Sequence, residues 1–356
     1  MWPYWFLFLL PSFSAAMSAT RPHAKGRYGA LTWPIMGIVL VLMIGFRFEV
    51  GGDWFNYQAH YFDVLDVPLG EVLERPDPGY YLLTWLSAQW GLGVFLVNTV
   101  CGVLFSWGLL AFCQAQPRPW LALAVAVPYL VTVVAMGYSR QGVAIGLAML
   151  GLVRLARHQN LQFVLCVGLA ATFHKTAVLL IPLAVLANPR GRLWSALWVG
   201  ITAALMYWAL LAESVDALVT NYIVAEYEYE SEGAAIRVTM NALPAMLLLL
   251  FRRRVVWQSA AERNLWSLMA WAALATIPLL ILLPSSTAVD RMALYLIPLQ
   301  PFVFSRLPDW LARFGGRRIW IVSILAYYAA VLFVWLLFAS HAQYWLPYRF
   351  YLFELL

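Results

Sequence analysis

The chain has 356 residues, of which 63% are hydrophobic and 11% are charged, and its formal net charge is +6. A soluble domain carries about a quarter of its residues as charged side chains, so this chain has too little charge to cover a water-exposed surface and must have lipid as its solvent. The basic residues form short clusters between apolar runs, and no zinc-finger or RNA-binding motif occurs, so no nucleic-acid partner is expected.

Apolar segments fill most of the chain. In lipid, backbone polar groups must be satisfied within helices, and the alternating pattern of a membrane barrel is not seen. At roughly 20 residues per crossing, the length predicts a single transmembrane domain over 1–356, with about eleven or twelve transmembrane helices plus short re-entrant or interfacial helices. The apolar runs cover roughly 2–17, 30–46, 79–90, 94–113, 119–137, 141–156, 161–173, 176–187, 193–211, 236–250, 265–283, 292–305 and 318–339.

Basic clusters predict the orientation, because short cytoplasmic loops are enriched in Lys and Arg. All clusters fall inside the cytoplasm if 79–113 crosses only once and 161–187 is a hairpin of two short helices with its turn at 172–175. The run 2–17 is then a retained span, since basic residues follow it and do not precede it as in a signal peptide. The clusters are Arg21/Lys25/Arg27, Arg118, Arg154/Arg157, Arg190/Arg192, Arg252/Arg253/Arg254 and Arg313/Arg317/Arg318.

With this orientation the remaining polar segments fall together on the outer side of the membrane. They are the loops at about 47–78 and 213–235, the tail 340–356, and the polar breaks at 140–141, 174–175 and 290–291. Both chain ends are expected on the same side. The joint placement of these segments predicts one outward-facing polar cavity.

The first candidate site follows directly on a span and reads Arg47-Phe-Glu-Val-Gly51-Gly52-Asp53-Trp-Phe-Asn-Tyr57. The adjacent glycines permit a tight turn that brings backbone N–H groups near a ligand. The Arg47 guanidinium suits phosphate, and the Asp53 carboxylate can accept a proton. The alternative interpretation is a membrane-exit turn with a charge pair and interfacial aromatic side chains.

Two further pairs of polar residues interrupt apolar runs near their outer ends. Arg140 and Gln141 open a span, where an arginine facing lipid would cost about 2.5–3.5 kcal/mol or more. Arg140 is therefore expected to face a cavity or partner, or else to snorkel to the interface. His174 and Lys175 form the tip of the predicted hairpin, where two adjacent titratable groups favour a site over simple packing.

The last candidates are Asp290 and Arg291, with Tyr295 one turn further on. The alternative for this pair is mutual neutralisation or helix capping. The acidic run in 213–232 mixes carboxylates with tyrosines, which suits sugar hydroxyls, although a solvated loop explains it as well. It lacks the glycine turn and spacing of a calcium loop, so no metal site is expected.

Several reaction classes are disfavoured because their motifs are missing. The sequence has no Walker A motif, no dinucleotide fingerprint, no HExxH and no GxSxG. The soluble domain that normally holds a nucleotide sugar is missing as well. Its three cysteines form no metal or redox motif. No cofactor is expected.

The motifs occur in a recognisable order. They are Arg47…Gly51-Gly52-Asp53-Trp54…Tyr57, Arg140-Gln141, Phe173-His174-Lys175-Thr176, Asp290-Arg291…Tyr295 and Trp345-Leu-Pro347-Tyr348. Over nearly the whole chain this order resembles the EpsG family of bacterial polysaccharide-assembly proteins, which are Wzy-like polymerases of capsule, exopolysaccharide and O-antigen. The chain departs from that pattern beside Asp53, where Gly52 and Trp54 stand.

This resemblance implies an enzyme of the bacterial inner membrane whose active site faces the periplasm. Such an enzyme joins oligosaccharide repeat units carried on undecaprenyl diphosphate, without a nucleotide sugar, and its fold resembles the GT-C class of lipid-dependent glycosyltransferases. It commonly works with a chain-length regulator. The implied roles are catalysis by Asp53 or His174 as general base, and binding of diphosphate or glycan by Arg47, Arg140, Lys175, Arg291, Tyr57, Gln141, Asp290 and Tyr295.

Other functions stay open. A flippase for lipid-linked oligosaccharides would spread its polar residues through the bundle and show an internal repeat, whereas here they crowd one side. An O-antigen ligase or another lipid-linked glycosyltransferase would share the chemistry, although ligases usually display a larger outer loop. A membrane acyltransferase would need a second histidine or aspartate paired with His174.

Overall fold

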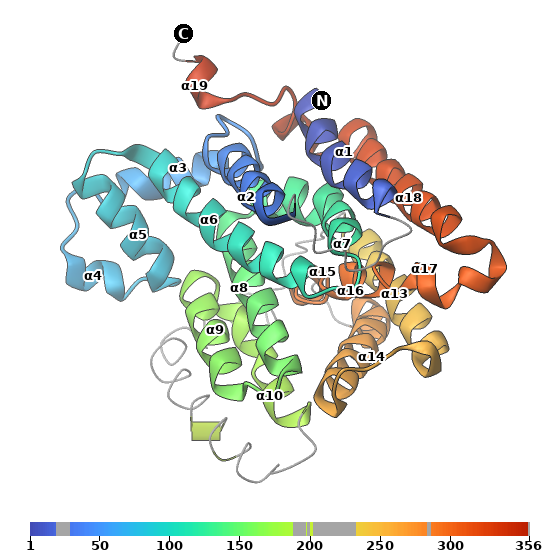
Figure 1. Ribbon diagram of the computed structural model, residues 1–356. Coiled ribbons are helices and arrows are strands. Elements are labelled where there is room, and N and C mark those ends of the chain that lie inside the picture. Colours follow the sequence, from blue (N-terminus) through green and yellow to red (C-terminus); the bar gives the residue numbers. More distant parts are fainter. Residues whose placement is uncertain (19–28, 188–196, 198–199, 202–232, 283–285, 355–356) are drawn as a thin grey trace.

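The computed structural model describes residues 1–18, 29–187, 197, 200–201, 233–282 and 286–354, and every regular element within them is a helix (Figure 1). The all-helical prediction is confirmed. Up to residue 187 the elements are α1 (Trp2–Met17), α2 (Gly29–Gly45), α3 (Trp54–Phe62), α4 (Leu69–Leu73), α5 (Pro78–Gln89), α6 (Gly93–Gln114), α7 (Pro119–Ala126), η1 (Val127–Ala135), α8 (Ser139–Ala156), α9 (Asn160–Phe173), η2 (Lys175–Leu180) and α10 (Pro182–Leu186). From residue 233 they are α13 (Ala234–Phe251), η4 (Arg252–Arg254), α14 (Ala260–Leu282), α15 (Ser286–Leu294), α16 (Leu299–Phe304), α17 (Leu307–Trp310), η5 (Ala312–Phe314), α18 (Gly316–Phe338), η6 (Ala342–Tyr344) and α19 (Tyr351–Glu354).

Four of the described helices are long and apolar enough to cross a membrane, namely α6, α13 with η4, α14 and α18. Shorter apolar helices cover 31–45, 119–135, 160–173 and 175–186. The expected eleven or twelve long spans are therefore not found in this part of the chain, because several apolar runs form helices too short for a perpendicular crossing. Most of the expected run 193–211 and most of the expected loop 213–235 lie outside the described residues.

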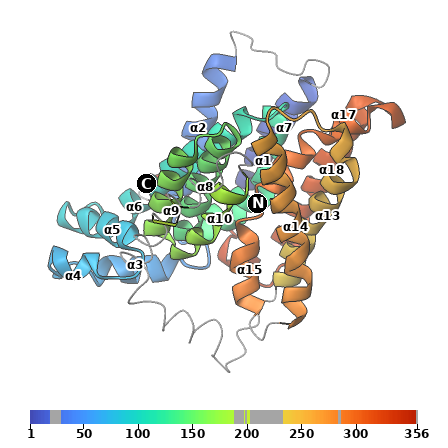
Figure 2. The same ribbon diagram turned by 90° about the horizontal axis from the view of Figure 1, so that it is seen from below.

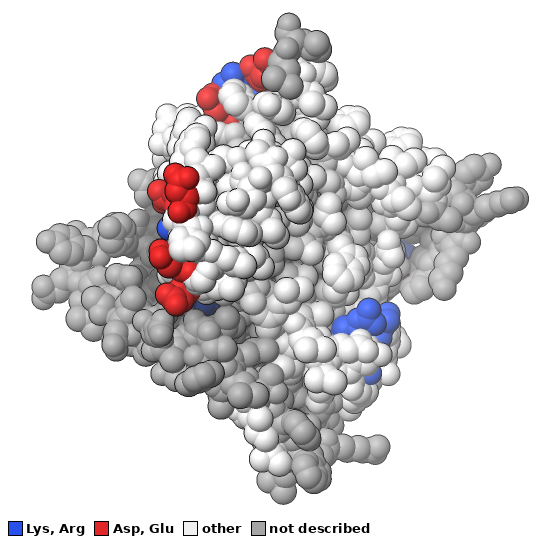
Figure 3. Space-filling model, turned by 90° about the vertical axis from the view of Figure 1, so that its left-hand side faces the viewer, with Lys and Arg blue, Asp and Glu red and all other residues white. Residues whose placement is uncertain are grey.

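The described surface fits a lipid environment. Large apolar side chains stand exposed on several helices, among them Phe13, Leu250, Ile281 and Phe338. Figure 3 shows a face on which the described charged residues gather at a few places and the rest is uncharged. Because exposed charge is costly in lipid, this distribution is that of a membrane-embedded protein.

Basic residues from distant parts of the chain meet at one end of the bundle. Arg118, which precedes α7, pairs with Asp309 of α17, and Arg317 at the start of α18 donates to the same carboxylate at 2.7 Å. Arg254 donates to the backbone oxygen of Trp310 at 2.7 Å. The described basic clusters thus share one end, as the charge pattern predicts, which leaves the other end for the candidate site.

The segment 161–187 folds back on itself as the charge pattern predicts. Ser259 donates to the backbone oxygen of Ala156, just before α9, and Asn264 donates to that of Ala187, just after α10. Both ends of the segment therefore lie beside the start of α14, at the basic end. The chain reverses at His174, whose extended backbone separates α9 from η2.

Close helix contact at the centre is made possible by small residues. A Cβ atom added to Gly108 of α6 would lie 1.8 Å from the backbone oxygen of Gly146 in α8, so neither helix tolerates a side chain there. Nearly all of α8 is buried. This packing fixes the direction of α8, and with it the first residues of that helix, which belong to the candidate site.

The expected outer loop 47–78 is partly helical. It contains α3 and α4, which pack with α5 into a group beside the main bundle (Figures 1 and 2). With twelve residues, α5 is about 18 Å long, too short for a perpendicular crossing. That length agrees with the prediction of a re-entrant or interfacial helix.

The expected tail 340–356 is anchored to the bundle as far as Tyr351, whose backbone N–H donates to the backbone oxygen of Phe46 at 2.8 Å. Trp345 is buried and donates from its indole nitrogen to the backbone oxygen of Thr132 at 2.7 Å. The Tyr4 hydroxyl donates to the backbone oxygen of Trp345 at 2.6 Å. The N-terminal helix and the C-terminal segment therefore lie at the same end, away from the basic clusters.

Candidate functional site

A cavity of about 940 Å³ opens at the end opposite the basic clusters. Its walls come from the start of α8, from α13, α15 and α18, and from the segments around Asp53, His174 and Ser340. Seven of the ten predicted site residues line it, which are Asp53, Tyr57, Arg140, Gln141, His174, Asp290 and Arg291. The predicted gathering of these residues in one cavity is confirmed, whereas their contacts with substrate stay predictions.

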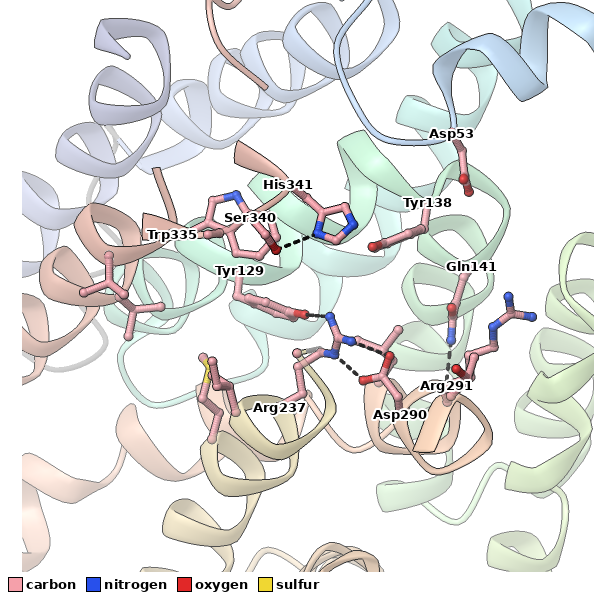
Figure 4. A pocket seen from close by; sticks show the side chains of 18 of the residues that line it. Asp53, Tyr129, Tyr138, Gln141, Arg237, Asp290, Arg291, Trp335, Ser340 and His341 are labelled. Carbon is pink, nitrogen blue, oxygen red and sulfur yellow. Dashed lines mark hydrogen bonds and ion pairs between the residues drawn. The ribbon is translucent and has the colours of Figure 1, made fainter. Parts of the chain in front are cut away.

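The deepest charged group of the cavity is an ion pair that the sequence reasoning did not predict. Arg237, in the first turn of α13, donates to both carboxylate oxygens of Asp290 in α15, with its Nη2 at 2.6 Å from Oδ2 (Figure 4). The same guanidinium donates to the Tyr129 hydroxyl at 3.0 Å. The bidentate partner of Asp290 therefore comes from another helix, whereas the sequence offered only its neighbour Arg291 as an alternative partner.

A signal for Arg237 was present in the sequence. It stands at the outer start of an apolar run, as Arg140 does, and the cost of an arginine facing lipid applies to both. The cavity is also lined by four residues that the sequence did not predict as site residues, which are Tyr129, Tyr138, Ser340 and His341. They lie inside or beside apolar runs, where a tyrosine, serine or histidine gives no distinctive pattern.

A second buried carboxylate holds Arg140. Asp77 accepts from Arg140 Nη1 at 3.1 Å and from the backbone N–H of Lys175 at 3.1 Å. The Asp77 side chain is 9% exposed, whereas that of Arg140 is 30% exposed and reaches the cavity. Asp77 thereby joins the start of α8 to the tip of the 161–187 hairpin, and it orients Arg140 while part of the guanidinium stays accessible to a ligand.

The Asp53 carboxylate lines the cavity just before the start of α3. Tyr57 and Asn56 approach its oxygens at 3.4 and 3.5 Å, which are long hydrogen bonds. Burial raises the pKa of Asp53, while the positive charges of Arg140 and Arg291 oppose that rise. A carboxylate with a raised pKa binds a proton more readily and is a better general base.

His174 has the opposite electrostatic environment. Burial, together with the positive charges of Arg291, Arg140 and Lys175, lowers the pKa of His174 to about 3. Its Nδ1 lies 2.9 Å from the Thr176 hydroxyl, which itself contacts the Tyr295 hydroxyl at 3.3 Å. The imidazole is therefore neutral at ordinary pH and held in place by hydrogen bonds.

Three predicted ligands lie outside the cavity, and for one of them the geometry corrects the prediction. Arg47 is fully buried and donates to Ser139 Oγ at 2.7 Å and to Asn98 Oδ1 at 3.3 Å. It also donates to the backbone oxygens of Ile44, at the end of α2, and of Val50, in the turn that follows. It joins α2, α6 and α8 and is not available to a diphosphate. The Lys175 and Tyr295 side chains are likewise not part of the lining.

The glycine turn before Asp53 also differs from its predicted use. Gly51 has a positive φ of 104°, and a Cβ there would lie 2.2 Å from the backbone oxygen of Met136. Its N–H donates to the backbone oxygen of Tyr344 at 2.8 Å. The glycine is needed for close packing of the turn between two other segments, which places Asp53 at the cavity, rather than for contact of its N–H with a ligand.

Gln141 lines the cavity and also connects two of its walls. Its Nε2 donates to the backbone oxygen of Arg291 at 3.0 Å, so α8 and α15 are held together beside both arginines (Figure 4). Within the described residues, no three His, Cys, Asp or Glu side chains gather as a metal-binding group. The charged chemistry of the cavity thus comes from three arginines and two carboxylates.

Comparison with known protein families decides the assignment. The model of the EpsG family matches residues 30–350, nearly the whole chain. The chain belongs to the EpsG family. Searches of curated proteins and of solved structures gave no match. Membership of the EpsG family indicates a role in polysaccharide biosynthesis, and the matched range includes every lining residue named above.

Proposed function

We propose that this chain is a polysaccharide polymerase that joins oligosaccharide repeat units carried on undecaprenyl diphosphate at the outer face of the bacterial inner membrane. The observation that carries the proposal is the convergence of Arg140, Arg237 and Arg291 with the Asp53 carboxylate in one cavity. A lipid diphosphate leaves with two or more negative charges. Guanidinium groups stabilise such charge best when they are preorganised, as Arg140 and Arg237 are by their carboxylate partners.

The proposed reaction transfers the growing glycan to a hydroxyl of the next lipid-linked unit. The acceptor oxygen forms a bond to the anomeric carbon of the donor, and the bond from that carbon to the diphosphate oxygen breaks. The electron pair of the broken bond leaves with the diphosphate, beside the arginines. The hydroxyl proton goes to Asp53, so that charge and atoms balance without a nucleotide, metal or other cofactor.

Asp53 is a better candidate base than His174. The pKa of His174 is lowered to about 3, so its imidazole has little affinity for a proton, whereas the pKa of Asp53 is raised by burial. His174 lines the cavity as a neutral group that can donate or accept a hydrogen bond to sugar. We therefore assign proton transfer to Asp53 and substrate positioning to His174.

The proposal is tested with the purified chain in nanodiscs and a synthetic lipid-linked repeat unit. The expected product is a ladder of chain lengths, formed in the presence of EDTA and without added nucleotide. A single transfer to a lipid A-type acceptor, with no ladder, would instead indicate a ligase. In sealed proteoliposomes, movement of the intact lipid-linked unit across the bilayer, with no new glycosidic bond, would indicate a flippase.

A further inference from the structure

The cavity has a second, apolar part that the proposed chemistry does not use. Tyr327, Ala330, Val331, Val334 and Phe338 of α18 all line it. Their spacing of three or four residues places them on one face of the helix. Val334 and Phe338 remain 53% and 73% exposed, so this face is a groove wall and not a packed core.

The length of this wall matches one leaflet of a bilayer. Phe338 lies eleven positions after Tyr327, which corresponds to about 16 Å along the helix. Half of a hydrocarbon core is about 15 Å. Because α18 is one of the helices long enough to span the membrane, and Phe338 is its last residue, the wall extends from the outer end of the helix to about the middle of the membrane.

The opposite wall is also apolar and continues directly to the arginines. Ile236 and Met240 of α13 face the cavity on either side of Arg237 in sequence. Tyr129, which accepts the hydrogen bond from Arg237, lies edge-on to Trp335 of α18 at 6.2 Å between ring centroids. A ligand with an anionic head at Arg237 therefore has a continuous apolar path beside α18.

The two walls come from helices that pack mainly against different neighbours. Helix α18 packs against α1 and α7, whereas α13 packs against α14, α15 and α16, and α16 also contacts α18 through the Phe304 ring. The apolar part of the cavity is lined by both α18 and α13. A ligand there need not be smaller than the cavity, because its chain can extend along the exposed face of α18.

We infer that the face of α18 from Tyr327 to Phe338, together with Ile236 and Met240 of α13, binds the polyprenyl chain of the diphosphate donor. This inference rests on the proposed function for the identity of the lipid. The occupant is a chain attached to a diphosphate, because the apolar groove ends at the Arg237–Asp290 ion pair and at Arg291, and the net positive charge of these three side chains complements that head group. A zwitterionic phospholipid head would match these charges less well.

The test is photo-crosslinking, which needs no turnover. The purified chain in phosphatidylcholine nanodiscs is incubated with a polyprenyl diphosphate that carries a diazirine in its chain, and the labelled residues are mapped by mass spectrometry. Labels are expected on the Tyr327–Phe338 face. Excess unlabelled polyprenyl diphosphate should compete, and excess phosphatidylglycerol should not.

A matched pair of variants distinguishes the groove from the general lipid-facing surface. Val334→Trp fills the groove, whereas Val322→Trp adds the same bulk to a lipid-exposed position of α18 (59% exposed) that does not line the cavity. Val334→Trp should lower the crosslinking yield about tenfold or more, the loss expected when two methylene-sized contacts are displaced. Val322→Trp should leave it unchanged. Ala330→Leu provides a smaller obstruction if Val334→Trp does not fold.

The outcomes separate this inference from the proposed function. Three outcomes would show only partition of the probe into bulk lipid and would overturn the groove assignment. They are labels spread evenly over the lipid-facing helices, an equal loss of crosslinking in both valine variants, and competition by phosphatidylglycerol. A ladder of products without groove labelling would overturn the groove alone. Groove labelling in a chain that forms no ladder would contradict the polymerase proposal and leave the lipid site standing.

Discussion

Asp53 and His174 line the same cavity, but their surroundings shift their proton affinities in opposite directions. Asp53→Asn should lower turnover about 10²–10⁴-fold, the usual loss on removal of a general base, while the lipid-linked donor still binds. His174→Ala should have a smaller effect on turnover, because its imidazole is already neutral and weakly basic. Initial rates and donor binding, measured separately for the two variants, check this. A larger rate loss in His174→Ala would reverse the assignment.

The same assignment predicts a dependence on pH. A base must be ionised to act, so turnover should fall as the pH decreases through the pKa of Asp53. Because burial raises that pKa, the fall should occur above the value of about 4 that is usual for an aspartate. His174 does not contribute to the fall in turnover in this pH range, since it stays neutral above a pH of about 3. The pH–rate profile of His174→Ala should therefore show the same fall at low pH as that of the wild-type chain.

The arginines are expected to act through geometry as well as charge. Arg140→Lys and Arg291→Lys should keep partial activity, because lysine keeps the charge but loses the planar fork. Arg140→Ala and Arg291→Ala should lower turnover about 10²–10³-fold, as removal of one preorganised donor does elsewhere. Arg157→Ala, in the cluster at the opposite end, is the matched control and should remain active. Full activity in both cavity alanine variants would remove these residues from the site.

At the scale of elements, Asp77 connects α5, α8 and the hairpin. Asp77→Asn keeps the size and an acceptor for the Lys175 N–H but removes the ion pair with Arg140. The KM for the donor should rise about tenfold or more, since a hydrogen bond to a charged group contributes about 1.5–3 kcal/mol. Asp309→Asn breaks a comparable pair with Arg118 at the other end. Asp309→Asn should lower the thermal stability of the chain without changing the KM for the donor. If Asp309→Asn and Asp77→Asn changed that KM equally, a positioning role for Asp77 would be excluded.

The contact between α6 and α8 predicts a pure stability effect. Gly108→Ala places a Cβ 1.8 Å from the backbone oxygen of Gly146, so the helices must separate, at a cost of about 1–3 kcal/mol or more. Gly70→Ala is the control, because no atom lies within 4 Å of its added Cβ and alanine favours the helix. Thermal unfolding should show a loss for the first variant only. Similar midpoints would contradict the close approach of the two helices.

At the scale of the whole molecule, the order of charges along the chain predicted more than the pairing of individual residues. It predicted that Arg118, Arg254 and Arg317 share one end and that 161–187 turns back at His174, because charge bias acts on whole segments. The order of charges could not predict that the Arg47 guanidinium donates only to backbone oxygens and buried side chains. That role depends on Ser139 and Asn98, which are distant in sequence and have no charge to mark them.

The partners of Asp290 and Arg140 were missed for a related reason. Arg237 and Asp77 lie 53 and 63 residues away from them, and the sequence alone suggested only the adjacent Arg291 as an alternative partner of Asp290. Hydropathy marks apolar runs but not where a helix breaks, so several described runs form shorter helices than a full span needs. His174 and Tyr138, for example, stand at breaks that only the packing of the surrounding helices reveals.

The orientation of the molecule in the membrane is the remaining prediction. The basic clusters are expected in the cytoplasm and the cavity outside. Cys166, the native cysteine that is not buried, is first replaced, because Cys101 and Cys113 lie in the core. A cysteine at position 174 should then react with a membrane-impermeant maleimide added to spheroplasts, whereas one at position 253 should react only after the membrane is opened.

The two positions test the hairpin and the cavity together. His174 lines the cavity, and Arg253 stands beside Arg254, which contacts the basic end at Trp310. Since the structure places them at opposite ends, their labelling must be reciprocal, and the parent lacking Cys166 gives the background. Labelling at 174 only after opening, with 253 accessible in spheroplasts, would place the arginine cavity in the cytoplasm. The donor diphosphate would then have to be bound before it crosses the membrane, and polymerisation at the outer face would be untenable.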